Sequence, residues 1–141
     1  MKITLTREND NVHFTSQGIA PVKVHIDGSP NVGGEDAGAR PMELVLMALG
    51  GCSAIDLVSI LKKQRQQIDD LQIEVEGYRE PDAVPAPFKS IHLKFILTGI
   101  IDEDKLKRAI QLSVEKYCSV QVMLAPTVDI TWSHVILPKT A

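Results

Sequence analysis

The sequence predicts an α+β fold in which antiparallel strands pack on a long central helix. Three observations lead to this class. Several short runs alternate apolar and polar side chains with a period of two, which indicates strands with one buried face. Two other runs have helical spacing, and turn-forming residues separate the runs. The predicted order is three strands, a long helix, two strands, two helices and a last strand, in a single domain over residues 1–141.

The first 26 residues predict an antiparallel meander of three strands. Residues 3–6 and 22–26 alternate apolar and polar side chains, and a turn at 9–11 precedes a third short run at 12–15. The glycine-rich stretch 28–39 follows and predicts a loop. It lacks the glycine spacing of phosphate-binding loops, so it does not indicate a nucleotide site.

A long helix is predicted from Pro41 to about Gln67. Proline suits the first turn of a helix, and Glu43 complements the helix dipole there. The first part is apolar nearly all round, which predicts a central helix buried on most faces. The apolar run is about long enough to cross a membrane, but it contains Asp56 and a pair of glycines. We therefore expect protein, and no membrane, around this helix.

The second half of the chain predicts a long hairpin, two helices and a strand. Residues 71–78 and 91–97 alternate strictly and are separated by a proline-rich turn. Asp102 is placed to cap a helix whose apolar stripe continues to Tyr117 and which ends at Cys118. A short helical turn at 119–124 and a strand from 128 to 137 complete the prediction.

Composition and charge narrow the possible functions. The 141 residues are 44% hydrophobic and 23% charged, which is typical of a globular protein. The net charge of −3 and the absence of a basic cluster argue against nucleic-acid binding. The first residues contain no apolar signal-peptide core, so we expect a cytoplasmic protein with reduced cysteines. The histidines are scattered and the two cysteines are far apart, so we expect no metal and no other cofactor.

Cys52 and Cys118 are the residues most able to carry chemistry. Taken alone, each is better explained as a small buried apolar residue. Cys52, however, follows Gly50 and Gly51, which leave room for a close approach, and Cys118 lies at the predicted end of a helix. A thiol that reacts with peroxide needs thiolate character, access and a second thiol to resolve the sulfenic acid. Two cysteines are compatible with this reaction, but their presence alone does not favour it over buried, inert thiols.

Two segments resemble the OsmC/Ohr family of osmotically inducible and organic hydroperoxide resistance proteins. They are residues 41–54, which contain Ala-Leu-Gly-Gly-Cys-Ser-Ala around Cys52, and residues 115–120, which are Glu-Lys-Tyr-Cys-Ser-Val around Cys118. The resemblance implies an intertwined homodimer with the cysteine helix at its centre and the active sites at the subunit interface. It also implies a thiol-dependent peroxidase that reduces organic hydroperoxides without metal or flavin.

The same resemblance implies roles for individual residues. Cys52 would attack the small-molecule peroxide, Cys118 would resolve the product as a disulfide, and a dithiol reductant would regenerate both. Arg40 would favour the Cys52 thiolate and orient the peroxide, and Glu43 would orient Arg40. Because Arg40 lies ~18 Å from Cys52 along a straight helix, it acts only by folding back or across a subunit interface. Arg7 is the alternative arginine.

Two departures from the family pattern leave other functions open. The family glutamate ten residues before the first cysteine is Met42 here, and the proline usual after the second cysteine is Ser119. One alternative is therefore a non-enzymatic dimer that binds a small ligand or senses redox state through the same pocket. Another is a structural dimer with inert, buried thiols. A carboxylate beside a thiol raises the thiol pKa, so we expect Asp56 to pair elsewhere, with Lys62, Lys63 or a partner subunit.

Overall fold

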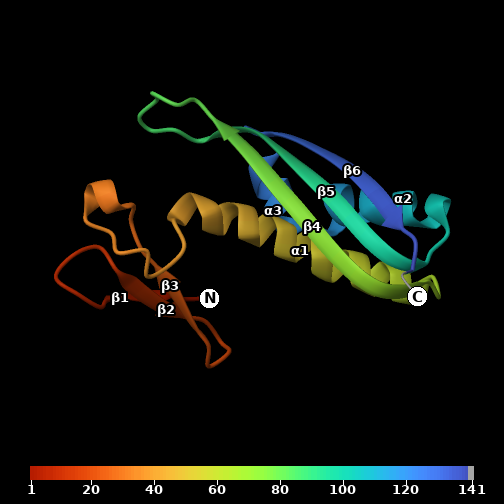
Figure 1. Cartoon of the computed structure of the whole chain (residues 1–141), viewed down its shortest axis with the longest axis horizontal. Helices are drawn as coiled ribbons and strands as arrows, with labels where there is room; N and C mark the ends of the chain where they lie inside the picture. Colours follow the sequence, from red (N-terminus) through yellow and green to blue (C-terminus); the bar gives the residue numbers. More distant parts are fainter. Residues whose placement is uncertain (140–141) are drawn as a thin grey trace. The chain divides into compact units, whose positions relative to one another are not determined.

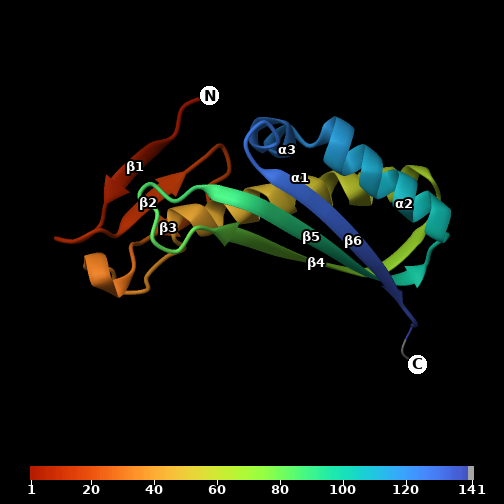
Figure 2. The same cartoon turned by 90° about the horizontal axis from the view of Figure 1, so that it is seen from above.

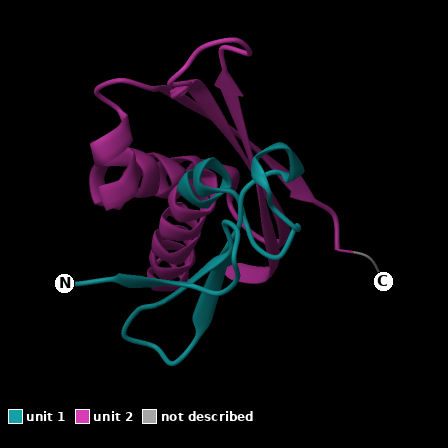
Figure 3. Ribbon diagram, turned by 90° about the vertical axis from the view of Figure 1, so that its left-hand side faces the viewer, with its two compact units in different colours: residues 1–45 teal, residues 46–141 magenta. Residues whose placement is uncertain are grey.

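The computed structural model describes residues 1–139 and confirms the α+β class (Figure 1). The chain forms two compact units, Met1–Val45 and Leu46–Ala141 (Figure 3). Two compact units can belong to one domain, so the single domain over residues 1–141 stays a prediction. Each unit is described below by its own elements.

The first unit contains the predicted antiparallel meander. Its strands are β1 (Thr4–Arg7), β2 (Phe14–Gln17) and β3 (Lys23–Ile26), with β2 in the centre. Each neighbouring pair is antiparallel. The short strands and their mostly exposed side chains leave this sheet with little core of its own.

The glycine-rich loop after β3 is organised around the carboxylate of Asp27. This side chain is buried and accepts backbone N–H bonds from Gly28 at 2.8 Å, Glu35 at 2.8 Å and Ala37 at 3.1 Å. These bonds, led by the one from Glu35, lower the pKa of Asp27. The loop also contains the short 3-10 helix η1 (Pro30–Val32). One carboxylate thus fixes a segment that composition alone describes only as a loop.

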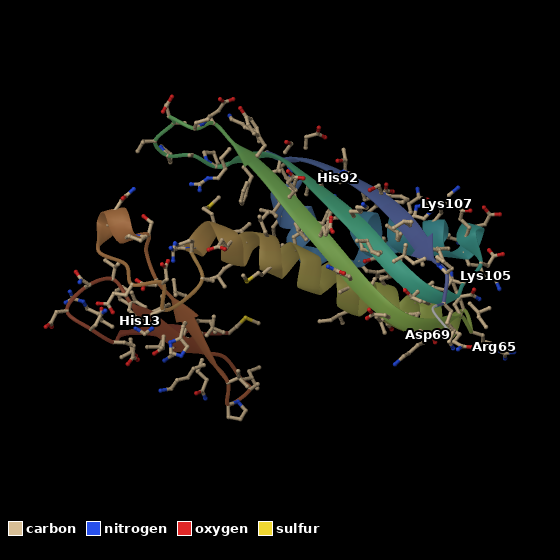
Figure 4. The ribbon with its side chains drawn as sticks, viewed as in Figure 1. His13, Arg65, Asp69, His92, Lys105 and Lys107 are labelled. Atoms are coloured by element: carbon tan, nitrogen blue, oxygen red, sulfur yellow. The ribbon has the colours of Figure 1, made fainter. Side chains whose placement is uncertain are left out.

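Helix α1 (Pro41–Lys63) begins as predicted and ends earlier than predicted. Glu43 accepts the backbone N–H of Arg40 at 2.9 Å, as the third residue of a capped helix does. At the other end Arg65, labelled in Figure 4, has a left-handed backbone with φ +58°. The N–H of Gln66 bonds back to the Leu61 carbonyl. This is a Schellman ending, which stops the helix before the predicted Gln67.

Within one chain a single stripe of α1 is buried, and the predicted burial of its other faces stays a prediction. The buried residues recur at helical spacing: Leu49, Gly50, Ser53, Leu57 and Leu61. Met47 and Ile55 lie on another face and are 55% and 74% exposed. This stripe contacts the rest of the second unit, since Ser53 bonds to Ser113 and a Cβ atom at Gly50 would meet the Val75 side chain. Figure 2 shows α1 running alongside the strands of this unit. By length and composition alone α1 also meets the requirement for a membrane span, as core helices of soluble proteins can.

The second sheet has the order β4 (Gln67–Arg79), β5 (Phe88–Ile100) and β6 (Asp129–Leu137). The predicted hairpin of β4 and β5 is confirmed as an antiparallel pair. The pairing of β5 with β6 is parallel, which corrects the expectation of antiparallel strands throughout. The helical segment between these strands carries the chain back along the sheet, so β6 runs in the same direction as β5.

Three helical segments connect β5 to β6. Helix α2 (Glu103–Leu112) is capped as predicted by the Asp102 side chain, which accepts the N–H of Lys105 at 2.9 Å. A five-residue π-helix (Ser113–Tyr117) and helix α3 (Ser119–Leu124) follow. The core of this unit is mostly aliphatic, with Phe88 and Phe95 as buried aromatic rings. Its fully buried side chains include Leu57, Leu61, Phe95, Leu97, Leu106 and Ile110.

Candidate functional site

Cys118 is positioned by the break between the π-helix and α3. Its N–H bonds to the Ser113 carbonyl at 2.9 Å, and its own backbone is extended, with φ −73° and ψ 104°. The side chain is fully buried. Its sulfur accepts the N–H of Gln121 at 3.4 Å and the Ser53 hydroxyl at 3.7 Å. Wide helical turns of this kind often occur at functional sites, where they displace a side chain from the regular helical path.

Ser53 and Ser113 join α1 to this break. The Ser113 hydroxyl donates to the Ser53 carbonyl at 2.9 Å, and both residues are fully buried. The Ser53 hydroxyl in turn donates to Cys118, so the two segments are linked by consecutive buried bonds. A buried polar network of this kind fixes one arrangement because each unmade bond would be costly.

The two cysteines lie together as free thiols, with Cys52 half-buried and Cys118 buried. Burial raises the pKa of Cys118, and the neighbouring Cys52 raises it further. The hydrogen bonds from Gln121 and Ser53 act in the opposite direction but do not cancel the rise. The site therefore pairs one thiol that solvent can reach with one that stays protonated.

Arg40 and Glu43 lie in the first unit, and their two side chains do not bond to each other within the described residues. The Arg40 guanidinium forms an ion pair with Asp36 and donates to the Gly38 carbonyl at 3.4 Å. Glu43 binds the Arg40 backbone instead. The hydrogen bond from Asp36 raises the pKa of Arg40 and keeps the guanidinium charged. The structure therefore brings the thiols together, and a contact of Arg40 with them stays a prediction.

The alternative arginine, Arg7, bonds to the backbone of the turn that follows β1. Its guanidinium donates to the Asn11 carbonyl at 2.8 Å and to that of Asp10. These local bonds hold the turn between β1 and β2. They give Arg7 a structural role in the described chain.

Ser53 and Asp36 were missed by sequence reasoning. Ser53 is adjacent to Cys52, but its hydrogen bond to Cys118 joins residues that are 65 positions apart. No local sequence pattern predicts such a pair. Asp36 did carry a signal, since it is an acid four positions before Arg40 in a loop that already looked unusual.

The histidines have hydrogen-bond partners within the chain. His13 bonds to His25 at 2.9 Å, and His92 lies between the hydroxyls of Thr131 and Ser133 (Figure 4). Among residues 1–139 no three His, Cys, Asp or Glu side chains are grouped so that they could hold a metal ion.

Asp56 lies one helical turn after Cys52 and does not have the expected partner in its own chain. Its Oδ2 atom is buried and has no hydrogen bond within the described residues, and no ion pair joins it to Lys62 or Lys63 there. The second atom of this kind is Oε1 of Gln64.

Comparison with known proteins identifies relatives along nearly the whole chain. The model of the family described as OsmC-like protein matches residues 33–133. Protein YhfA of Escherichia coli K12 is 40% identical over 129 residues, which are 91% of this chain and 92% of that protein. A crystal structure of a hypothetical protein from Aquifex aeolicus has a TM-score of 0.80 and 32% identity, covering 96% of both chains. The organic hydroperoxide resistance protein OhrB of Bacillus subtilis shares the fold, with a TM-score of 0.63, 21% identity and coverage of 95% and 96%.

Proposed function

The chain belongs to the family of OsmC-like proteins, and from that premise we propose that it is a thiol-dependent peroxidase for organic hydroperoxides. The observation that carries the proposal is the pairing of a half-buried Cys52 with a buried Cys118. The fold shared with a hydroperoxide resistance protein agrees with it. A cytoplasmic location, where free thiols persist, suits this chemistry.

The proposed reaction begins at Cys52. Its thiolate attacks one oxygen of the hydroperoxide, the O–O bond breaks, and the alkoxide leaves as an alcohol after taking up a proton. Cys52 becomes a sulfenic acid. Arg40, held by Asp36, favours the thiolate and orients the peroxide, and Glu43 holds the Arg40 backbone at the start of α1.

Cys118 completes the cycle. As its thiol loses a proton, the sulfur attacks the Cys52 sulfur and displaces water, leaving a disulfide. Ser53 and Gln121 already donate to the Cys118 sulfur and so favour the negative charge that develops on it. A dithiol reductant then exchanges twice with the disulfide and restores both thiols. The raised pKa of Cys118 keeps this thiol protonated until the sulfenic acid has formed.

A homodimer completes the proposal. Gly51 lies between Met47 and Ile55 on the exposed stripe of α1, and a Cβ atom at Gly51 would meet nothing within 4 Å. A small residue between two apolar ones allows a second helix to approach closely. Cys52 is the next residue, so the contact between subunits would border the thiols.

Mass spectrometry after one equivalent of cumene hydroperoxide tests the reaction. The protein should lose about 2 mass units as the disulfide forms, and Cys118→Ala should instead gain about 16 as a sulfenic acid. Cys52→Ser should show neither change and no turnover with dihydrolipoamide as reductant. Full turnover by Cys52→Ser would refute the peroxidase. Thiols that stay reduced in the native protein would favour a dimer that only binds a small ligand.

A further inference from the structure

The hydroxyl of Ser53 is a polar side-chain group in contact with the Cys118 sulfur. Its oxygen lies 3.7 Å from that sulfur, and both residues are fully buried. The other donor to the sulfur is the backbone N–H of Gln121, which cannot accept a proton. Of these two donors, only the Ser53 hydroxyl can therefore both take up a proton and give one away.

The backbone of Ser53 is held in place while its hydroxyl stays free to turn. The Ser53 carbonyl accepts the hydroxyl of Ser113 at 2.9 Å, and this bond is fully buried. Within residues 1–139 the Ser53 hydroxyl itself bonds to no atom other than the Cys118 sulfur. A serine hydroxyl that donates one bond still has two acceptor positions, and it rotates to suit its partners. Ser53 is thus fixed as a residue and able to exchange donor and acceptor roles.

The resolving step has to move a proton in a place that solvent does not reach. The Cys118 thiol must lose its proton, and the hydroxyl that leaves the Cys52 sulfenic acid must gain one to become water. Cys118 is 0% exposed, and burial disfavours both a free thiolate and a free hydroxide. Cys118 neighbours both Cys52 and Ser53, which are consecutive residues of α1. A sulfenic acid on Cys52 would therefore form close to the Ser53 hydroxyl.

We propose that Ser53 relays this proton during the resolving step, an inference that rests on the proposed peroxidase reaction. The Cys118 thiol gives its proton to Ser53 Oγ while the Ser53 hydroxyl passes its own hydrogen to the sulfenic oxygen on Cys52. As the S–S bond forms, the S–O bond breaks, water leaves and the serine hydroxyl is restored. The Cys118 sulfur is oxidised and the Cys52 sulfur is reduced, so the step needs no outside acid, base or oxidant. Because Ser53 contacts a reacting sulfur, it is a catalytic residue of this step.

The pH dependence of the resolving rate tests the relay in the wild-type protein. The full chain is mixed with cumene hydroperoxide and quenched with acid at intervals. Mass spectrometry then follows the conversion of the species about 16 mass units heavier into the one about 2 units lighter. A relay needs no free thiolate, so the rate should not rise between about pH 6 and pH 8. A rise of about tenfold per pH unit, as in a reaction that waits for free thiolate, would overturn the proposal.

Ser53→Ala assigns the relay to one hydroxyl. Its resolving rate at neutral pH should fall about a hundredfold, and it should then rise about tenfold per pH unit because only the thiolate fraction of Cys118 reacts. Ser59→Ala is the matched control, since it removes an exposed hydroxyl from the same helix, and it should keep the wild-type rate and pH profile. A wild-type rate and profile in Ser53→Ala would overturn the proposal.

Cys118→Ala separates a failure of the relay from a failure of the peroxidase. With cumene hydroperoxide this variant should accumulate the sulfenic acid at Cys52. If it does, and Ser53→Ala still resolves at the wild-type rate, the relay is wrong and the peroxidase stands. If Cys118→Ala forms no sulfenic acid, the peroxidase and the relay are both wrong.

Discussion

The Cys118 sulfur has a protonation state that depends on folding. In the folded chain it is buried, and this burial raises its pKa above that of an exposed thiol. In the unfolded chain it is an ordinary thiol with a pKa of about 8.5. Between these two pKa values the folded chain keeps a proton that the unfolded chain has lost, so the free energy of unfolding falls as the pH rises. Below the lower value this contribution to stability is fully present.

We therefore expect Cys118→Ala to have a flatter stability profile in alkaline solution. Urea unfolding of the wild type and the variant, measured from about pH 7 to pH 10, should show an additional decline in the wild type above about pH 8. Side chains that do not interact with Cys118 contribute equally in both proteins and cancel in the difference. Profiles that stay parallel over this range would contradict a raised pKa at Cys118.

At this scale the sequence predicted the meeting of the two cysteines better than it predicted the residues around them. Cys52 and Cys118 were identified through two motifs, and the structure places them together. The hydroxyl of Ser53 and the carboxylate of Asp36 were missed, because their roles come from contacts that the fold creates. Residue type indicates what a side chain can do, whereas its partner depends on which segments meet.

Among the elements, α1 shows why helix starts were easier to predict than helix ends. Pro41 and Glu43 are favourable in the first turn and mark the start in the sequence. The end depends on a left-handed residue, which is usually glycine, and here Arg65 takes that position. The direction of β6 was also missed, since alternation marks a strand without giving the direction of its neighbour.

Arg65→Gly should stabilise the protein. A left-handed backbone is unfavourable for a residue with a Cβ atom, and glycine removes that cost, although the unfolded chain gains some freedom. We expect the free energy of unfolding to rise by about 0.5–1 kcal/mol, measured in urea. Lys63→Gly is the matched control within the helix and should lower it by about the same amount. A loss of stability in Arg65→Gly would contradict the helix ending described here.

For the whole molecule, the exposed stripe of α1 is the feature that a single chain leaves unexplained. Ile55 is 74% exposed on a helix that is apolar on most sides. Exposed apolar patches on soluble proteins usually mark interaction sites. The sequence predicted a helix buried on most faces, and the proposed homodimer would bury the remainder.

Ile55→Lys should separate the proposed dimer into single chains, because a charge would have to be buried in the contact between the helices. Light scattering after size exclusion should give twice the chain mass for the wild type and the mass of one chain for the variant. Val84→Lys is the control, since Val84 is 96% exposed in the turn between β4 and β5. Dissociation by Val84→Lys, or a wild type that is already a single chain, would contradict the proposed contact.

The parallel pairing of β5 with β6 has a consequence for synthesis on the ribosome. Strand β5 is central in its sheet, yet the partner on one of its edges ends only at Leu137. At 5–20 residues per second, the ribosome needs about two to seven seconds to proceed from the end of β5 to the end of β6. During that interval the emerging β4–β5 hairpin has an open edge, the kind of surface to which other chains add. A chaperone that shields this edge would therefore be needed most until β6 has been made and can pair with β5.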